Sequence, residues 1–170
     1  MNEQQFWKIL MKYFRKIGFL ILNGSFLISV NQVMAMQEPR DLYDFSHQET
    51  SGVWMIVNDG VMGGISESRL SLDLQGFLVF EGRVSLDYGG GFASVRSILN
   101  RLDADLFDGI LIRFKGDGKR YQLRLRQGDR MDGVAYFRHF ETKCGEWEEV
   151  FLPFDSFHAS YRGRRLPDYP

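Results

Sequence analysis

Residues 109–126 read GILIRFK, then GDGK, then RYQLRLR. Apolar and polar side chains alternate in both runs, which is typical of a β-strand that buries one face. The connection contains two glycines and an aspartate, a composition that favours a tight turn between neighbouring strands. The stretch predicts two strands joined as a hairpin. On the first strand we expect one face to carry Ile110, Ile112 and Phe114 and the other to carry Leu111, Arg113 and Lys115. On the second strand we expect one face to carry Tyr121, Leu123 and Leu125 and the other to carry Gln122, Arg124 and Arg126.

Other short runs of strand-favouring residues lie on both sides of this predicted hairpin in the sequence. Turn residues such as Gly, Asn and Asp separate them, and no sustained helical period occurs after Met36. The pair 68–74 and 77–86, joined through Gln75 and Gly76, predicts a second hairpin. Regularly spaced short strands indicate an all-β sandwich or barrel. The remaining predicted strands are 54–57, 92–98, 134–141 and 147–152, with Pro153 ending the last.

Composition and charge exclude several classes of protein. The chain has 170 residues, enough for one domain, and a net charge of −1. Four basic residues lie in the first 35, so the remainder is mildly acidic and gives no reason to bind nucleic acid. One cysteine, Cys144, permits no internal disulfide, and the three scattered histidines offer no zinc-ligand spacing. We expect neither a metal nor a cofactor.

Residues 1–35 have the pattern of a hydrophobic leader. A basic segment ends at Lys16, an apolar segment spans 17–30, and Val33 and Ala35 suit cleavage before Met36. The pattern predicts a signal peptide, a helical leader, and export to the periplasm or cell envelope. The alternatives are an uncleaved membrane anchor, a mitochondrial presequence if the source is eukaryotic, or translation that begins at Met36. Any membrane contact is expected through this leader.

Four phrases in this order and spacing carry a family resemblance: WMIVNDGVMGGIS (54–66), GGFASVR (90–96), GDGKRY (116–121) and WEEVFLPF (147–154). Together they resemble the complex I intermediate-associated protein 30 family, also called the NADH:ubiquinone oxidoreductase intermediate-associated domain. The resemblance covers roughly residues 42–165. We therefore expect a family domain over 36–165 and a short tail over 166–170.

The resemblance implies a galactose-binding-like β-sandwich of jelly-roll type, from which this chain lacks the last strands. It also implies a non-catalytic, protein-binding chaperone or scaffold whose partner is a respiratory-complex assembly intermediate or, after export, an envelope protein. The family has no known catalytic residues, and no catalytic group stands out here: His139 lies within a predicted strand, without a nucleophile motif beside it. The rival hypothesis is an exported carbohydrate-binding module, which would bind a glycan.

The loop 58–66 is the first candidate binding site. Asn58 and Asp59 could offer oxygen acceptors to a sugar or a cation, and Met62 an apolar contact. The alternative is turn chemistry, because glycines dominate this loop and permit positive φ and close backbone approach. Trp54 and Trp147 could stack on a sugar ring, or could pack in the core.

A cationic face is the second candidate. Arg113, Lys115, Arg124 and Arg126 fall on one face of the predicted hairpin, and Arg96 is expected near them. Such a face could bind an acidic glycan, a lipid headgroup or an acidic protein surface. The alternative is a solvated sheet face whose charge is neutralised by neighbouring carboxylates. Arg162 to Arg165 are interpreted as a solvated tail.

Overall fold

The computed structural model describes residues 8–14, 40–43, 45, 54–98, 104–127 and 133–169, the first of these as backbone. Nearly all regular structure is β, which confirms the all-β prediction. The strands are β1 (Lys8–Phe14), β2 (Arg40–Tyr43), β3 (Trp54–Asn58), β4 (Glu67–Leu72), β5 (Leu78–Arg83), β6 (Ala93–Ser97), β7 (Gly109–Lys115), β8 (Arg120–Arg126), β9 (Ala135–Glu141), β10 (Trp147–Pro153), β11 (His158–Tyr161) and β12 (Arg164–Arg165). In the part of the chain that the structure describes, no helix has the length and hydropathy needed to span a bilayer.

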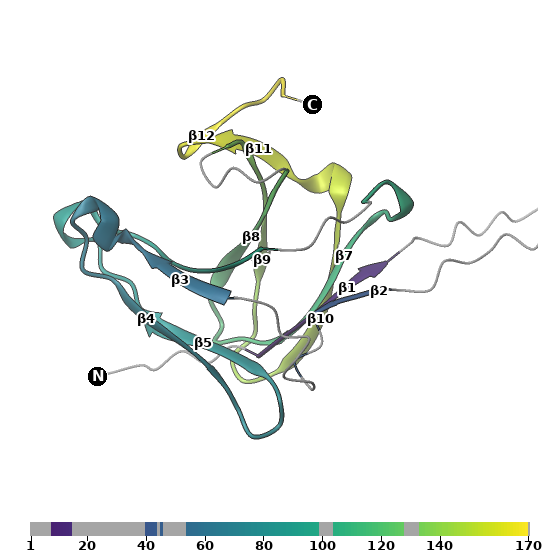
Figure 1. Cartoon of the computed structure of the whole chain (residues 1–170), viewed down its shortest axis with the longest axis horizontal. Coiled ribbons are helices and arrows are strands. Elements are labelled where there is room, and N and C mark those ends of the chain that lie inside the picture. Colours follow the sequence, from purple (N-terminus) through teal and green to yellow (C-terminus); the bar gives the residue numbers. More distant parts are fainter. Residues whose placement is uncertain are drawn as a thin grey trace, which may run out of the picture.

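The strands form three antiparallel groups (Figure 1). A six-stranded sheet has the order β10-β7-β1-β5-β4, with β2 paired to β1; a four-stranded sheet has the order β12-β11-β9-β8; and β3 pairs with β6. The predicted hairpin β4–β5 is confirmed, in a register that runs from Glu67 opposite Arg83 to Leu72 opposite Leu78. Its turn is held by Asp73, whose Oδ1 accepts hydrogen bonds of 2.9 Å from the backbone N–H groups of Gln75 and Phe77.

The core lies between the six-stranded and four-stranded sheets. Ile110, Ile112 and Phe114 of β7 are almost completely buried, so the predicted alternation of this strand is confirmed. Residues from the four-stranded sheet pack against them, including Tyr121, Leu123, Leu125 and Phe140. The apolar faces of two sheets thus cover one another, which is how amphipathic strands remove their apolar side from water.

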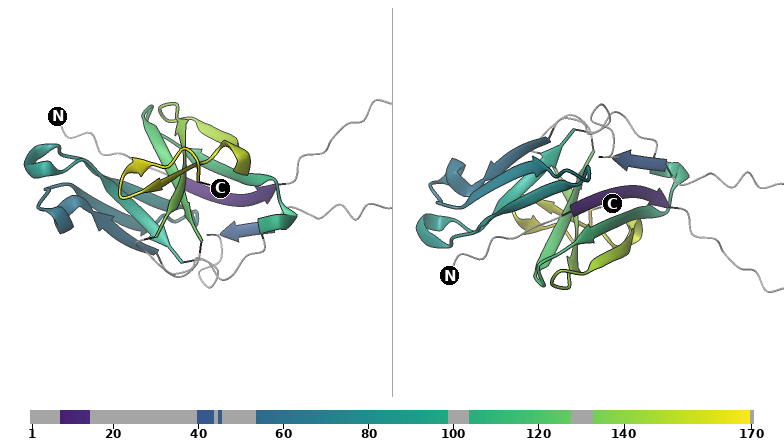
Figure 2. Two further views of the ribbon diagram at one scale, coloured as in Figure 1. Left: turned by 90° about the horizontal axis from the view of Figure 1, so that it is seen from above. Right: turned by 90° about the horizontal axis from the view of Figure 1, so that it is seen from below.

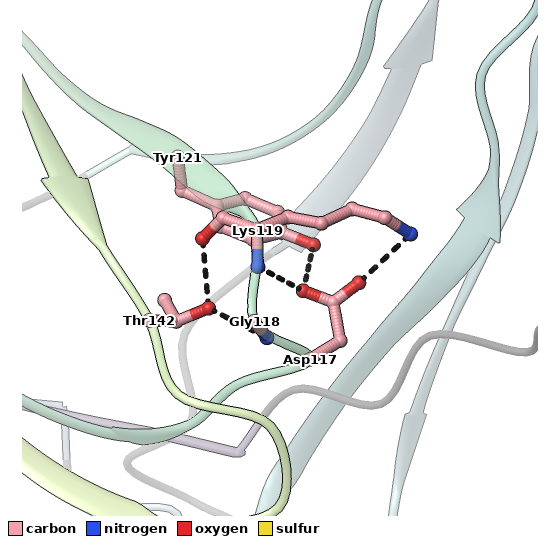
Figure 3. A network of polar contacts seen from close by, with 5 residues as sticks. All are labelled: Asp117, Gly118, Lys119, Tyr121 and Thr142. Atoms are coloured by element: carbon pink, nitrogen blue, oxygen red, sulfur yellow. Dashed lines mark hydrogen bonds and ion pairs between the residues drawn. The ribbon is translucent and has the colours of Figure 1, made fainter.

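The prediction that 109–126 form a hairpin was wrong in its pairing. Both strands exist, but β7 pairs with β10 and β8 pairs with β9, so the connection between β7 and β8 crosses from one sheet to the other. Thr142 fixes this crossing (Figure 3): its Oγ1 accepts a hydrogen bond of 3.1 Å from the N–H of Gly118 and donates one of 2.8 Å to the carbonyl of Lys119. A Cβ on Gly116 would lie 2.3 Å from the Cβ of Thr142, so glycine is required there.

Asp117 stabilises the same connection between β7 and β8. Its Oδ1 accepts hydrogen bonds from the backbone N–H of Lys119 at 3.2 Å and from the Tyr121 hydroxyl at 2.9 Å, and its Oδ2 pairs with the Lys119 ammonium at 3.2 Å (Figure 3). These contacts explain the phrase GDGKRY: the glycines give the chain room and the aspartate ties the turn to the start of β8.

Strand β1 comes from the segment expected to be a leader. It lies between β7 and β5, as the purple strand of Figures 1 and 2 shows, and pairs with β7 along six residues. Its register sets apolar residue types opposite the buried positions of β7, in the pairs Ile9–Phe114, Met11–Ile112 and Tyr13–Ile110. Residues 8–14 include isoleucine, tyrosine and phenylalanine, which favour strands, and the helix expected for the leader is not confirmed there. The apolar segment 17–30 and the cleavage site before Met36 lie outside the described residues.

The prediction that 147–152 is the last strand was also wrong. A 3₁₀ turn at Phe154–Ser156 redirects the chain, and β11 then pairs with β9 and with β12. The two-residue turn between β11 and β12 has positive φ at Arg162 (46°) and Gly163 (79°). Positive φ at both positions is the geometry that two-residue hairpin turns favour. Arg164 and Arg165 therefore belong to a short strand and not to a tail.

Candidate functional site

Two loops meet at one end of the molecule, where Asp59 holds them together. One loop contains the 3₁₀ turn Asp59–Met62 and the other the turn Asp87–Gly89, and the views in Figures 1 and 2 agree that they lie side by side. Asp59 has no solvent exposure. Its Oδ1 accepts a hydrogen bond of 2.9 Å from the N–H of Ser66, and its Oδ2 accepts bonds from the Ser66 hydroxyl (2.5 Å), the N–H of Gly91 (2.7 Å) and the N–H of Phe92 (3.2 Å).

The glycines of the two loops leave room for this carboxylate. A Cβ on Gly64 would lie 2.5 Å from the Asp59 carboxyl group, and one on Gly90 would lie 2.8 Å from Asp59 Oδ2 and 2.6 Å from the Ser85 carbonyl. The phrases 54–66 and 90–96 therefore describe one structure: a buried carboxylate wrapped by backbone. This supports the interpretation of these glycines as a requirement of folding.

Hydrogen bonding keeps Asp59 ionised. The Ser66 hydroxyl lowers the pKa of Asp59 most, burial opposes it, and the N–H groups of Gly91, Ser66 and Phe92 lower it further, to about 2. A carboxylate that accepts several hydrogen bonds is stable without a metal or a ligand. In this structure Asp59 is closed off from solvent and offers no acceptor to a ligand, while Asn58 Oδ1 accepts a hydrogen bond of 2.7 Å from the Ser68 hydroxyl.

Exposed apolar side chains lie on the two loops that Asp59 joins. We call the following five residues the apolar rim: Val61, Met62, Ile65, Leu86 and Tyr88. Val61, Leu86 and Tyr88 each expose about four fifths of their surface. Tyr88 also has a positive φ of 54°, a conformation that bulky residues rarely adopt. Clustered exposed apolar side chains on a fixed frame are typical of a binding surface.

The arginines predicted on one face separate into two places. Arg96, Arg124 and Arg126 lie close enough that their charges act on one another: burial and then the charges of Arg126 and Arg124 lower the pKa of Arg96. Arg113 and Lys115 belong to the other sheet, because β7 and β8 do not pair. The guanidinium of Arg113 lies 5.1 Å from the ring centre of Trp147 and 3.9 Å from Glu149.

The two tryptophans do not form a platform for a sugar. Trp54 packs against Tyr43 and Phe45, with ring centres 4.7 and 5.8 Å apart, and borders the core. Trp147 is 38% exposed, but it contacts Phe77 at 4.8 Å and is covered by Arg113. They come from different sheets, Trp54 from β3 and Trp147 from β10.

The four-stranded sheet carries a groove on the side away from the core. Its volume is about 560 Å³, and its lining includes His139, His158, Arg120 and Arg165. Burial, followed by the charges of Arg120 and Arg124, lowers the pKa of His139. Its Nε2 lies 3.0 Å from the Gln122 amide nitrogen, so the imidazole contacts an amide there and not a nucleophile. Within the described ranges, no three His, Cys, Asp or Glu side chains gather closely enough to hold a metal ion.

Sequence reasoning missed Val61, Leu86, Tyr88 and Arg162. The first three lie in or beside Gly-rich turns, where the pattern indicates a turn but not which apolar side chains it leaves in water. Arg162 had a readable signal, because Arg162-Gly163 separates two short runs and Gly is typical of hairpin turns. Of the predicted residues, Met62 is in the apolar rim, and Arg96, Arg124 and Arg126 lie together.

Comparison with known proteins agrees with the phrases that form this structure. A family model described as Complex I intermediate-associated protein 30 (CIA30) matches residues 43–170. The mouse (Mus musculus) protein named "Complex I intermediate-associated protein 30, mitochondrial" is 26% identical over 153 residues, which cover 78% of this chain and 47% of the mouse protein. The chain thus spans about half the length of that relative. No solved structure matches it significantly. The chain belongs to the Complex I intermediate-associated protein 30 family.

Proposed function

We propose that this chain is a non-catalytic protein-binding domain that acts as a chaperone or scaffold in the assembly of respiratory complex I. The observation that carries the proposal is the apolar rim, held on a frame of buried hydrogen bonds around Asp59. Family membership supplies the class of partner, since the matched family is named for its association with complex I intermediates. The partner would be a subunit or subassembly that is not yet covered by its neighbours.

The geometry of the rim suits a protein partner. Its two loops are tied together by Asp59 and by the backbone bond from the N–H of Asp59 to the carbonyl of Phe92, so little ordering is needed on binding. Tyrosine and methionine, both present in the rim, are enriched at protein interfaces, and the exposed Leu86 adds apolar contact area. A glycan site would need an exposed aromatic platform with polar groups beside it, an arrangement that Trp54 and Trp147 do not form.

The finer predictions on fold and location are part of the same proposal. We propose a galactose-binding-like jelly-roll as the family fold that underlies the observed sheets. We also propose a mitochondrial location if the source is eukaryotic, because the mouse relative is named as mitochondrial. Export through a leader cleaved before Met36 stays a prediction.

Photo-crosslinking in the source cell tests the proposal. A photoreactive amino acid replaces Tyr88 in the tagged full chain, because this side chain is 78% exposed within the rim. We expect crosslinks to subunits of respiratory complex I. The same chain with Met62→Ser and Leu86→Ser should lose most of them, because the apolar contact area shrinks.

Leu74→Ser is the matched control, since Leu74 is fully exposed on the β4–β5 turn, outside the rim. This control should keep the crosslinks. Crosslinks to complex I subunits that persist in the Met62/Leu86 variant would place the contact elsewhere. Crosslinks restricted to proteins outside the respiratory complexes would overturn the proposed partner class, and so would full assembly of complex I in cells that lack this chain.

A further inference from the structure

A small cavity lies between the four-stranded sheet and the turn that joins β11 to β12. Its volume is about 150 Å³, and Arg124, Arg126 and Arg162 line it together with Ser160 and the backbone of Gly133 and Gly163. Two arginines come from β8 and the third from the turn, so elements more than thirty residues apart bring three guanidinium groups to one cavity. We call it the arginine cavity.

The hydrogen-bond and ring partners of these arginines in the structure are neutral groups. Arg126 Nη1 donates a hydrogen bond of 2.6 Å to the Gly133 carbonyl, and Arg124 Nε donates to the Gln122 side-chain oxygen. Arg162 lies over the ring of Tyr161 at 5.4 Å. Among the residues that the structure describes, no carboxylate forms an ion pair with any of the three; the ion pairs found there involve other residues.

The positive charges of these arginines repel one another, and their contacts with neutral groups do not neutralise that charge. Burial and then the charge of Arg126 lower the pKa of Arg124, and both charges act in the same direction on nearby Arg96. Like charges brought close together repel one another, and the repulsion is stronger where burial reduces screening by water. Clustered arginines that repel one another favour an anion that satisfies several of them at once.

The turn that carries Arg162 has an unfavourable backbone conformation beside the same cavity. Arg162 has φ of 46°, and left-handed backbone is unfavourable for a residue other than Gly, Asn or Asp. The turn nevertheless places an arginine in the lining of the cavity, although glycine or asparagine would adopt this conformation with less strain. Strain and repulsion therefore occur together around one small cavity.

We propose that the arginine cavity binds a phosphate group. Guanidinium groups recognise phosphate through paired, charge-assisted hydrogen bonds, and the several oxygens of a tetrahedral phosphate can be shared among three arginines. A volume of about 150 Å³ accommodates one such group with its nearest water. The phosphate is either free in solution, as in a small phosphorylated molecule, or the headgroup of a lipid. The site lies on strands β8 and β11 and is independent of the apolar rim.

Titration of the purified full chain with inorganic phosphate at low ionic strength tests the site, with ³¹P line broadening and isothermal calorimetry as readouts. We expect saturable binding that Arg162→Gln and Arg124→Gln each weaken about tenfold, the loss of roughly one charge-assisted contact. Arg124→Lys should recover part of the affinity, because the charge remains while the paired geometry is lost. Arg162 is exposed, so its variant should keep the wild-type melting temperature.

Arg83→Gln is the matched control, because it removes one exposed positive charge from β5, in the other large sheet. It should leave phosphate binding unchanged. Sedimentation with vesicles that contain phosphatidic acid distinguishes the two sources. Vesicle binding that free phosphate displaces and Arg162→Gln abolishes identifies a lipid headgroup as a ligand. Absence of saturable phosphate binding, or equal weakening by Arg83→Gln and Arg162→Gln, would overturn the proposal.

Discussion

Asp59 is a charged residue whose partners all belong to its own chain. The carboxylate accepts four hydrogen bonds from Ser66, Gly91 and Phe92, and two glycines make room for it. The sequence indicated the turn chemistry of these glycines correctly. The role of Asp59 stayed open, because an Asn-Asp-Gly turn can leave its carboxylate in water or bury it against backbone N–H groups, and the sequence is the same in both cases. Burial decides between those roles, and burial depends on the second loop, more than twenty residues away.

Replacing Asp59 with asparagine should lower stability and flatten its response to acid. The pKa of Asp59 is held at about 2, below the unfolded value of about 3.9. Its contribution to stability is therefore complete above pH ~4 and is lost as pH falls towards 2. Chemical denaturation of wild type and Asp59→Asn between pH 2 and 7 measures this. We expect a lower midpoint for the variant at pH 7 and a smaller further loss below pH 4. Parallel pH profiles would contradict it.

Gly90→Ala should destabilise the chain by about 1–3 kcal/mol, because a new methyl group would overlap the Ser85 carbonyl and Asp59 Oδ2. Gly60→Ala provides the control in the same pair of loops, since a Cβ there would meet nothing within 4 Å. The control should change the free energy of unfolding by less than about 0.5 kcal/mol. Urea denaturation of the three proteins compares them, and equal losses in both variants would show that close packing at Gly90 is not the cause.

At the scale of elements, alternation in the sequence predicted strands better than it predicted their partners. Residues 68–86 form the predicted hairpin because a short connection, residues 73–77 with Asp73 closing the turn, brings the two strands back beside each other. Residues 109–126 show equally good alternation, yet β7 and β8 join different sheets. Alternation indicates which face of a strand is buried. A core between two sheets buries one face of each strand whether β7 and β8 pair with each other or belong to different sheets, so alternation does not distinguish these two arrangements. The choice depends on Thr142, whose contacts with Gly118 and Lys119 form only when β9 is in place.

Strand β1 was missed for a related reason. Lys8 and Lys12 give residues 1–16 the basic character of a leader, and that pattern masked the strand-favouring Ile9, Tyr13 and Phe14. The structure pairs this segment with β7 from Ile9 to Phe14. A short amphipathic strand and the basic part of a leader share the same residue types, so the sequence alone did not separate them.

Removing residues 1–35 should therefore leave an incomplete sheet. Without β1, strands β5 and β7 would present unpaired N–H and C=O groups and the apolar edge of the core. We expect the 36–170 chain to melt at a lower temperature than the full chain and to aggregate at concentrations where the full chain stays dispersed. Circular dichroism melts and light scattering compare the two. A 36–170 chain as stable as the full chain would show that the sheet does not need β1.

At the scale of the molecule, two chemically different surfaces lie on different elements. The apolar rim lies on the two loops next to β3, β4 and β6, and the arginine cavity is lined by residues of β8 and of the β11–β12 turn. Figure 1 shows the strands that carry these two surfaces. The two surfaces would allow the chain to hold an apolar partner and an anion at the same time. The net charge of −1 indicated neither surface. The sequence pattern gave Met62, Arg124 and Arg126, but it missed the residues that complete each surface, because those depend on which distant segments the fold brings together.

Without its partner, the apolar rim should make the full chain self-associate. Exposed apolar clusters promote association when nothing covers them. We expect sedimentation velocity to show reversible self-association that rises with concentration and is weakened by Met62→Ser combined with Leu86→Ser. Leu74→Ser, which removes an exposed leucine outside the rim, should leave the concentration dependence unchanged. The same association constant in all three proteins would indicate a contact elsewhere on the surface.

The position of β1 in the sheet also orders events in time. Its seven residues are the first of the described strands to be synthesised, whereas β7, its main partner, follows about 100 residues later, or roughly 5 to 20 s at ribosomal speeds. Pairing with β2 comes sooner, but two strands alone are marginal in water. Once β7 has formed beside it, the segment becomes part of the fold. The first described strand to be made is therefore among the last to find its main neighbour, and the sheet closes only when most of the chain is complete.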